Sequence, residues 1–221
     1  MKKIFVTATN TDIGKTFISS ILFNHLGENS CYYKPIQTGC EFLESNLIIP
    51  DVDYVREHSS NKNKEDFKCT YPLKFPLSPH LSSRKNNINI DIRKILEDFR
   101  EIENFYENII VEGAGGIFSP INTKNYFMYN LIKDLNLKAI VVTSTKVGTI
   151  NDTILTINHL KNSNIKISGV VFNNFTNKEH EIDNISFLTN YLNLKNTLII
   201  PYINKREDLN KDHILKFIEN L

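Results

Sequence analysis

The stretch that most constrains the fold is Ala8–Thr16, which ends in a Gly-Lys-Thr tripeptide. A short apolar run, Ile4–Val6, precedes it, and a helix-like run, Phe17–Leu26, follows. Strand, polar loop, Gly-Lys-Thr and helix is the order typical of a phosphate-binding loop. Backbone N–H groups at such a helix start face an anion, and the helix dipole favours negative charge there. The stretch predicts nucleotide binding, with Lys15 on the β- and γ-phosphates and Thr16 on Mg²⁺.

The spacing of this loop departs from the usual pattern. The position six residues before the lysine is normally glycine and is Thr9 here. Ala8 is small enough to replace a glycine but lacks its freedom at positive φ. Because a lone Gly-Lys-Thr is common by chance, the alternative is an ordinary strand-turn-helix with a surface lysine. The strand before and the helix after favour nucleotide binding.

Size and composition fit one domain spanning residues 1–221, with 41% hydrophobic residues. The net charge of +1 gives no bulk field for nucleic acid or membranes, and we expect neither as a partner. The apolar run after the basic start is too short for a signal peptide, and no stretch approaches a membrane span. Three cysteines without metal-type spacing predict free thiols in a reducing cytoplasm: Cys31, Cys40 and Cys69.

Short apolar runs alternate with longer helix-like segments, which predicts an α/β fold with a parallel sheet flanked by helices on both faces, as in P-loop NTPases. The polar segment 61–89 is the least regular and is expected to be an excursion from the sheet. The expected strands are Lys3–Thr7, Cys31–Lys34, Ile109–Glu112, Ala139–Ser144, Ile167–Asn173 and Thr197–Pro201. The expected helices are Lys15–Leu26, Asp51–Glu57, Asp91–Phe105, Phe127–Leu135, Asn151–Asn162, Ile182–Leu192 and Lys211–Leu221.

Glycine, lysine, threonine and acidic residues follow these strands, at the edge where ligands bind in such sheets. Glu112 ends an apolar run and is a natural Mg²⁺ ligand, although a solvated glutamate in a turn is the alternative. The glycines after it allow backbone to approach phosphate oxygens. Asp51, taken alone, is interpreted as a helix N-cap, and Asp53 could serve equally as a ligand.

Two further positions could contact anions. Lys34 precedes Pro35, where a strand is expected to stop, and is either a surface lysine or a cation that steadies charge during transfer. Gly148–Asn151 predicts a second helix start after a strand, which is either plain capping or a second anion site. His80 is expected in a first helical turn, because Ser78 suits the cap and proline the next position.

Taken together, these segments resemble the dethiobiotin synthetase family, the ATP-dependent ring-closing enzymes of biotin synthesis. The similarity runs in order from residue 4 to about 174. The Lys-Pro-x-x-Thr-Gly and Val-Glu-Gly-Ala-Gly-Gly segments together are specific, whereas the phosphate loop alone is not. The similar segments are Val6–Thr16, Tyr33–Gly39, Ser78–His80, Val111–Pro120 and Lys146–Asn151.

The resemblance implies a P-loop homodimer that joins 7,8-diaminononanoate and CO₂ (or bicarbonate) with ATP as co-substrate and Mg²⁺ as cofactor. One amine takes up CO₂ as a carbamate, the γ-phosphoryl group moves to it, and the second amine closes the cyclic urea. It implies catalytic roles for Lys15 and Lys34, and Mg²⁺ ligation by Thr16, Asp51 and Glu112.

The resemblance also implies two sets of binding residues. Those for the nucleotide are Asp12, Ile13, Gly14, Lys15, Thr16, Phe17, Asp51, Glu112, Gly113, Ala114, Gly115, Asn173, Asn174, Pro201, Tyr202 and Ile203. Those for the diamine, with the helix start reaching across a dimer interface to its carboxylate, are Thr11, Lys34, Thr38, Gly115, Val147, Thr149, Ile150 and Asn151.

Three departures from the family pattern and three alternatives stay open. Ala8 replaces a glycine, Asp12 stands where glutamate is common, and the part after Asn174 matches poorly, which bears on nucleotide preference. The alternatives are a regulatory ATPase of the partition or cell-division type, a nucleotide-binding scaffold without catalysis, and another amidoligase or kinase of this fold. The regulatory ATPases carry a second lysine five residues before Lys15, where this chain has Asn10.

Overall fold

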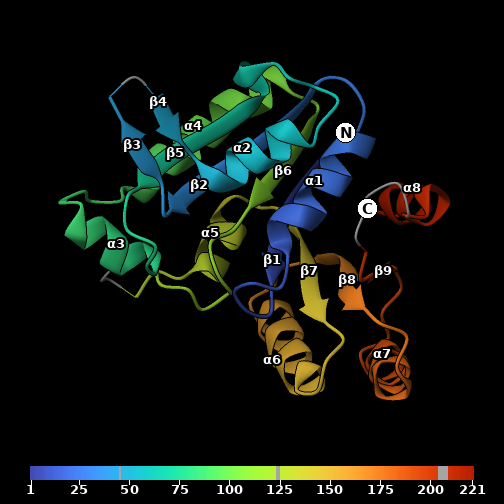
Figure 1. Ribbon diagram of the computed structural model, residues 1–221. Helices are drawn as coiled ribbons and strands as arrows, with labels where there is room; N and C mark the ends of the chain where they lie inside the picture. The colour runs from blue at the N-terminus through green and yellow to red at the C-terminus, as the bar shows by residue number, and fades with distance from the viewer. Residues whose placement is uncertain (45, 123–124, 204–208) are drawn as a thin grey trace.

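The computed structural model describes residues 1–44, 46–122, 125–203 and 209–221. A seven-stranded sheet in the order β5-β2-β6-β1-β7-β8-β9 forms its centre, and every pairing in it is parallel (Figure 1). The strands of the sheet are β1 (Lys2–Ala8), β2 (Ser30–Thr38), β5 (Phe67–Leu73), β6 (Asn108–Glu112), β7 (Lys138–Ser144), β8 (Ile167–Phe175) and β9 (Thr197–Pro201).

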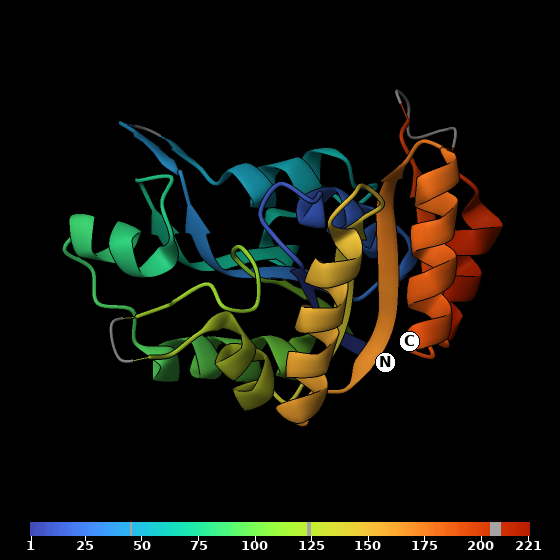
Figure 2. The same cartoon turned by 90° about the horizontal axis from the view of Figure 1, so that it is seen from below.

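Helices cover both faces of this sheet, as Figure 2 shows from below. The helices α1 (Lys15–His25), α2 (Pro50–Glu57) and α8 (Lys211–Glu219) pack on one face. The opposite face carries α4 (Ile92–Phe105), α5 (Met128–Asp134), α6 (Thr149–Asn162) and α7 (Glu179–Tyr191). Buried Val and Ile side chains of the central strands contact both helical layers, because a parallel sheet with crossover helices is dry on both sides. The predicted fold class is confirmed.

The prediction that a strand stops at Lys34 is wrong, because β2 continues to Thr38. Pro35 suggested a strand end, since proline cannot donate to a ladder. In the structure β2 pairs with β6 only as far as Tyr33, and beyond that point it pairs with β5 alone. Pro35 therefore lies past the part of β2 that is bonded on both sides, where a missing N–H is tolerated.

The expectation that segment 61–89 leaves the sheet is wrong for its middle part. Phe67–Leu73 forms β5, the edge strand beside β2. Its lysine, proline and half-buried side chains hid it in the sequence, and an edge strand tolerates all three. A 3₁₀ turn, η1 (Lys64–Asp66), precedes this strand, and α3 (Pro79–Lys85) follows it.

The start of α3 and the state of the cysteines agree with the predictions, whereas one small hairpin was not predicted. Ser78 is the N-cap residue of α3 and His80 lies in its first turn, as predicted. The three cysteines are free. A small hairpin of β3 (Glu41–Leu43) and β4 (Asn46–Ile48) was not predicted. Among the described residues, no helix is both long and apolar enough to cross a membrane.

Candidate active site

The loop between β1 and α1 ends at Gly14, which is the N-cap of α1 and adopts a left-handed backbone conformation with a φ of 93°. A Cβ atom at Gly14 would lie 2.3 Å from Asn173 Nδ2, so a larger residue would have to displace the Asn173 amide. Asn173, at the end of β8, donates from Nδ2 to the Ile13 carbonyl at 2.8 Å. Asp12 also has positive φ, at 56°. The backbone is thus shaped as a loop around the start of α1, the position that favours an anion.

An open pocket of about 430 Å³ lies beside this loop, at the carboxyl ends of β2 and β6. It gathers residues from four separate parts of the chain, as expected for a parallel sheet. Nearly all of its lining was predicted to bind nucleotide, metal or substrate. The lining residues are Thr11, Asp12, Gly14, Lys15, Thr16, Lys34, Gln37, Thr38, Asp51, Glu112, Ala114 and Gly115.

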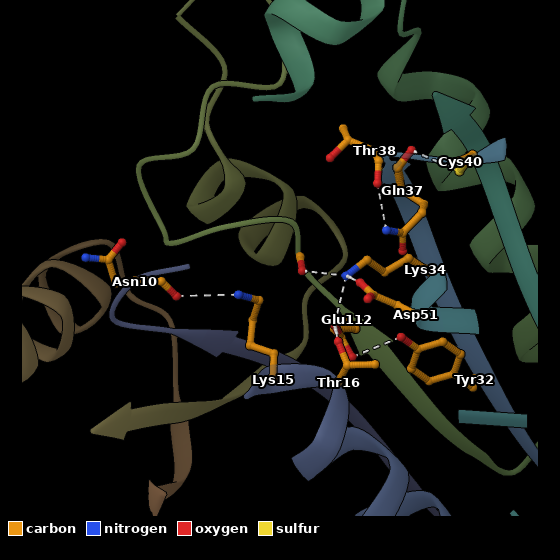
Figure 3. A network of polar contacts seen from close by, with 11 residues as sticks. Asn10, Lys15, Thr16, Tyr32, Lys34, Gln37, Thr38, Cys40, Asp51 and Glu112 are labelled. Carbon is orange, nitrogen blue, oxygen red and sulfur yellow. Dashed lines mark hydrogen bonds and ion pairs between the residues drawn. The ribbon is translucent and has the colours of Figure 1, made fainter. Parts of the chain in front are cut away.

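Lys34 is the centre of the polar network in this pocket (Figure 3). Its ammonium Nζ lies 2.6 Å from Asp51 Oδ2 and 2.8 Å from Glu112 Oε1, and it donates to the Gly113 carbonyl at 3.1 Å. The Lys34 side chain is only 3% exposed. Lys34 thus joins β2 to Asp51 of α2 and to the end of β6 at Glu112.

Glu112 is fully buried at the end of β6 and is the second centre of this polar network. The Thr16 hydroxyl donates to its Oε1 at 2.9 Å, and the Tyr32 hydroxyl donates to its Oε2 at 2.9 Å. Two hydrogen bonds and the ion pair with Lys34 compensate for burial of a charge that would otherwise be costly. Burial, and to a lesser degree the negative charge of Glu112, raises the pKa of Tyr32. The Tyr32 hydroxyl therefore keeps its proton and stays a donor.

The two lysines of the pocket differ in electrostatic setting. Burial works to lower the pKa of Lys34, but Glu112 and Asp51 outweigh it and raise that pKa. Burial works to raise the pKa of Asp51, and the Lys34 ammonium outweighs it, so that pKa is lowered. Burial and then the Lys34 charge lower the pKa of Lys15. Lys15 Nζ donates to the Asn10 carbonyl at 3.5 Å, a longer contact than any of those made by Lys34, so Lys15 is the less tightly held cation.

The three predicted metal ligands converge in this network. Thr16, Asp51 and Glu112 offer a hydroxyl and two carboxylates, the hard oxygen donors that Mg²⁺ prefers. Within the described residues, no group of three or more His, Cys, Asp or Glu side chains could hold a metal. A site with two carboxylates and one hydroxyl leaves room for phosphate oxygens, so the donor set fits Mg²⁺ bound together with a nucleotide.

Asp51 and Asp53, both in the first turn of α2, have different roles. The interpretation of Asp51 as an N-cap is wrong, because Ile49 is the N-cap of α2 and the Asp51 carboxylate faces Lys34. Asp53 does not serve equally. Its Oδ2 accepts from the Ile49 backbone N–H at 2.8 Å and its Oδ1 pairs with Arg56 at 2.6 Å. Asp53 therefore stabilises the helix start and Asp51 lines the pocket.

The structure does not bring every predicted site residue into the pocket. The backbone N–H of Tyr202 donates to the Phe175 carbonyl at 2.8 Å, and the Tyr202 side chain is 66% exposed at the end of β9. The hydroxyl of Thr149 is already engaged with the Ser144 carbonyl at 2.6 Å. The predicted residues outside the pocket lining are Ile13, Phe17, Gly113, Val147, Thr149, Ile150, Asn151, Asn173, Asn174, Pro201, Tyr202 and Ile203.

Two residues of the site were missed in the sequence. Gln37 lines the pocket and is 6% exposed, and Tyr32 holds Glu112 from β2. Gln37 lies in the Lys-Pro-Ile-Gln-Thr-Gly segment, so its neighbours were the only signal. For Tyr32 the sequence carries none, because an aromatic residue in an apolar strand is normally core.

A family model described as an AAA domain matches residues 2–209. The cell division ATPase MinD of Pyrococcus furiosus has a TM-score of 0.61 at 15% identity, covering 100% of this chain and 98% of that chain. The Pyrococcus horikoshii MinD complexed with Mg-ADP has a TM-score of 0.58 at 16% identity, covering 98% and 86%. Fold and loop together define a P-loop NTPase.

The sequence relatives are more specific. The ATP-dependent dethiobiotin synthetase BioD of Fusobacterium nucleatum is 40% identical over 98% of both chains. That of Clostridium botulinum strain Loch Maree is 36% identical over 99% of this chain and 98% of the relative. The chain therefore belongs to the ATP-dependent dethiobiotin synthetase family and is a ligase.

Proposed function

We propose that the protein forms dethiobiotin from 7,8-diaminononanoate, CO₂ and ATP, releasing ADP and phosphate. Family membership supports the reaction. The observation that carries it in this chain is the Lys34 ammonium, held beside the phosphate-loop lysine in one pocket. A scaffold that only bound nucleotide would not need a second buried cation there.

Three steps make up the proposed reaction. One amine attacks CO₂, forms an N–C bond and loses a proton to solvent. The carbamate oxygen then attacks the γ-phosphorus, and the bond to the bridging oxygen of ADP breaks. The second amine attacks the carbonyl carbon of this mixed anhydride, phosphate leaves, and the released proton again goes to solvent.

The lysines supply positive charge where negative charge develops. Lys15 follows the loop glycine at the first turn of α1, where it can reach the β- and γ-phosphates. Lys34 approaches from β2, on the side of the pocket that Thr38 also lines. We assign Lys34 to the carbamate and the γ-phosphoryl group, where a buried cation is worth more than in water. Thr11, Thr38 and Gly115 complete the substrate side.

Thr16, Asp51 and Glu112 would hold Mg²⁺ in this enzyme. Bound there, the ion would neutralise charge on the β- and γ-phosphate oxygens. Hydrogen bonds from Thr16 and Tyr32 hold Glu112, and the ion pairs of Lys34 hold Asp51 beside it. A neighbour of the same fold is described as complexed with Mg-ADP, which supports the proposal at the level of the fold.

We assign the nucleotide base to the ends of β8 and β9. Asn173 is 2% exposed, and its Oδ1 is buried without a partner, so an acceptor is available there. Asn174 and Pro201–Ile203 would border the base. Backbone of Ile13–Gly14 and of Gly113–Ala114, with Phe17 after the loop, would line the path to the phosphates.

A homodimer in the cytoplasm is the proposed state. Exposed apolar side chains surround α6, including Phe118 (54%), Val147 (86%) and Leu155 (62%). In a dimer, the start of α6 at Thr149–Asn151, with Val147 before it, would bind the carboxylate of the diamine held by the partner subunit. The backbone N–H groups of Ile150 and Asn151 would supply the donors, because the Thr149 hydroxyl donates to the Ser144 carbonyl and the Thr149 N–H donates to the Lys146 carbonyl.

Mass spectrometry of a reaction with purified protein, the diamine, ¹³C-bicarbonate, ATP and Mg²⁺ tests the proposal. We expect label in the ureido carbon of dethiobiotin and ADP formed in equal amount. ATP hydrolysis without labelled product would instead assign a regulatory ATPase or another ligase, to be separated by a screen of amine and carboxylate acceptors.

A further inference from the structure

The hydrogen bonds of Lys34 are complete in this structure. An ammonium group has three N–H donors, and these face Asp51 at 2.6 Å, Glu112 at 2.8 Å and the Gly113 carbonyl at 3.1 Å. Two of the three acceptors are the carboxylates of the proposed Mg²⁺ site. A cation of the protein itself therefore lies between the carboxylates that a divalent ion would require.

Mg²⁺ and the ammonium cannot both occupy that position. Lys34 already contacts Asp51 Oδ2 and Glu112 Oε1, and a divalent ion bound by the same two carboxylates would lie next to the ammonium, where two cations repel each other strongly. Glu112 cannot turn away freely, since Tyr32 and Thr16 fix its two oxygens. Lys34 has a flexible four-carbon chain and is the group able to move.

Gln37 offers an unpaired acceptor in the pocket that Lys34 also lines. Its Nε2 donates to the Thr38 carbonyl at 2.9 Å, and because a carbonyl only accepts, the amide orientation is fixed. Its Oε1 is buried and has no partner, the only such side-chain atom among the residues lining the pocket. An acceptor closed to water is costly when unpaired and can be satisfied by a nearby protein donor. Gln37 and Lys34 lie three residues apart on β2 (Figure 3).

We propose that Lys34 alternates between two positions and that metal binding drives the exchange. Without metal, its ammonium bridges Asp51 and Glu112 and keeps the acidic pair neutralised. With metal bound, the ammonium turns to Gln37 Oε1, on the substrate side of the pocket. Gln37 is then a positioning residue for Lys34. This inference rests on the proposed function, because it takes Thr16, Asp51 and Glu112 as the metal site.

Mn²⁺ binding to the full chain, followed by the EPR signal of free Mn²⁺ without nucleotide or diamine, tests the exchange. Lys34→Met should bind Mn²⁺ at least about tenfold more tightly than the wild type, because the competing ammonium is gone. Lys15→Met is the matched control. It removes the same charge from the same pocket, but Lys15 forms no ion pair in the described part of the chain, so its gain should be clearly smaller.

A double-mutant cycle tests the role of Gln37. Gln37→Met should weaken Mn²⁺ binding about tenfold in the wild type, because the displaced ammonium loses its acceptor, and should have no effect in the Lys34→Met background. Circular dichroism checks that each variant is folded. Equal gains from the two lysine variants, or the same Gln37→Met effect in both backgrounds, would overturn the exchange. Labelled dethiobiotin from the wild type alongside either result would leave the proposed function standing.

Discussion

At the residue scale, Lys34 is the side chain that balances the negative charges of the pocket. Its ammonium compensates two carboxylates, and the pocket keeps it 3% exposed. We predict that Lys34→Met lowers kcat by about 10- to 150-fold, because a hydrogen bond from a charged group contributes about 1.5–3 kcal/mol. Steady-state kinetics of labelled product formation measures it. Lys3→Met, which removes the lysine of the partly exposed pair with Glu103, should leave kcat unchanged.

A loss of less than about threefold in folded Lys34→Met protein would remove this lysine from the mechanism.

Two neighbouring aspartates also have different roles that the sequence could not distinguish. Asp51 and Asp53 are two positions apart on α2, yet one faces the pocket and the other binds backbone at the helix start.

At the element scale, Gly14 joins the phosphate loop to α1. We predict that Gly14→Ala costs more than about 2 kcal/mol of stability and weakens ATP binding, because it adds positive-φ strain and a contact with Asn173. Gly27→Ala is the matched control, since Gly27 has a φ of 84° and open space around its Cβ position. Denaturant unfolding and calorimetric ATP titration give both quantities. Equal stability losses in the two variants would contradict the Asn173 contact.

The start of α7 is fixed to the loop after β7 by Glu181. Its carboxylate accepts from the Thr145 hydroxyl at 2.5 Å and from the Thr176 hydroxyl at 2.7 Å. Burial works to raise the pKa of Glu181, and these bonds, with those from the Thr176 and Lys178 backbones, outweigh it and lower the pKa to about 2, from an ordinary 4.5. This stabilisation is present above the unfolded-state pKa and is lost as pH falls toward 2.

The corresponding prediction concerns Glu181→Gln. The variant should unfold about 2 kcal/mol more easily than the wild type at pH 7, and the difference should shrink as pH falls from about 5 to about 2. Urea unfolding at a series of pH values measures it. A difference that stays constant down to pH 2 would mean that the ionised carboxylate is not what stabilises this element.

At the scale of the whole molecule, the carboxylate site proposed at the start of α6 lies apart from the pocket of the same chain. The start of α6 is not among the residues that line it. Phe118 packs against His159 of α6, with ring centroids 4.3 Å apart, and remains 54% exposed, so it marks the proposed dimer surface. In the proposed dimer a second copy would complete the site, so activity would depend on assembly.

We predict that Phe118→Asp dissociates the dimer and lowers activity at least about tenfold, because a charge would have to be desolvated in the interface. Phe187→Asp is the control, as Phe187 is a comparably exposed aromatic residue on α7 and stacks on Tyr191. Analytical ultracentrifugation and the product assay follow both variants. A fully active monomeric wild type would refute the dimer.

A feature could be predicted from the sequence when it depends on residues that are close together in the chain. The phosphate loop, Thr16 and Glu112 were predicted because each depends on neighbours in the chain: a strand before, a helix after, glycines beside. Gln37 and Tyr32 were missed because their roles depend on contacts with distant segments. Asp51 was assigned to the metal only through family resemblance, because its local pattern indicated a helix cap.

The sequence by itself determined the fold class, the phosphate loop and the identity of the charged residues at the strand ends. Period, capping and glycine placement are local properties, so they can be read along the chain. Only the tertiary structure decided that β2 continues past Pro35, that β5 forms the edge of the sheet, and that Lys34 lies between Asp51 and Glu112. Those outcomes depend on which strands become neighbours, because burial next to the opposite charge exists only once distant segments have packed together.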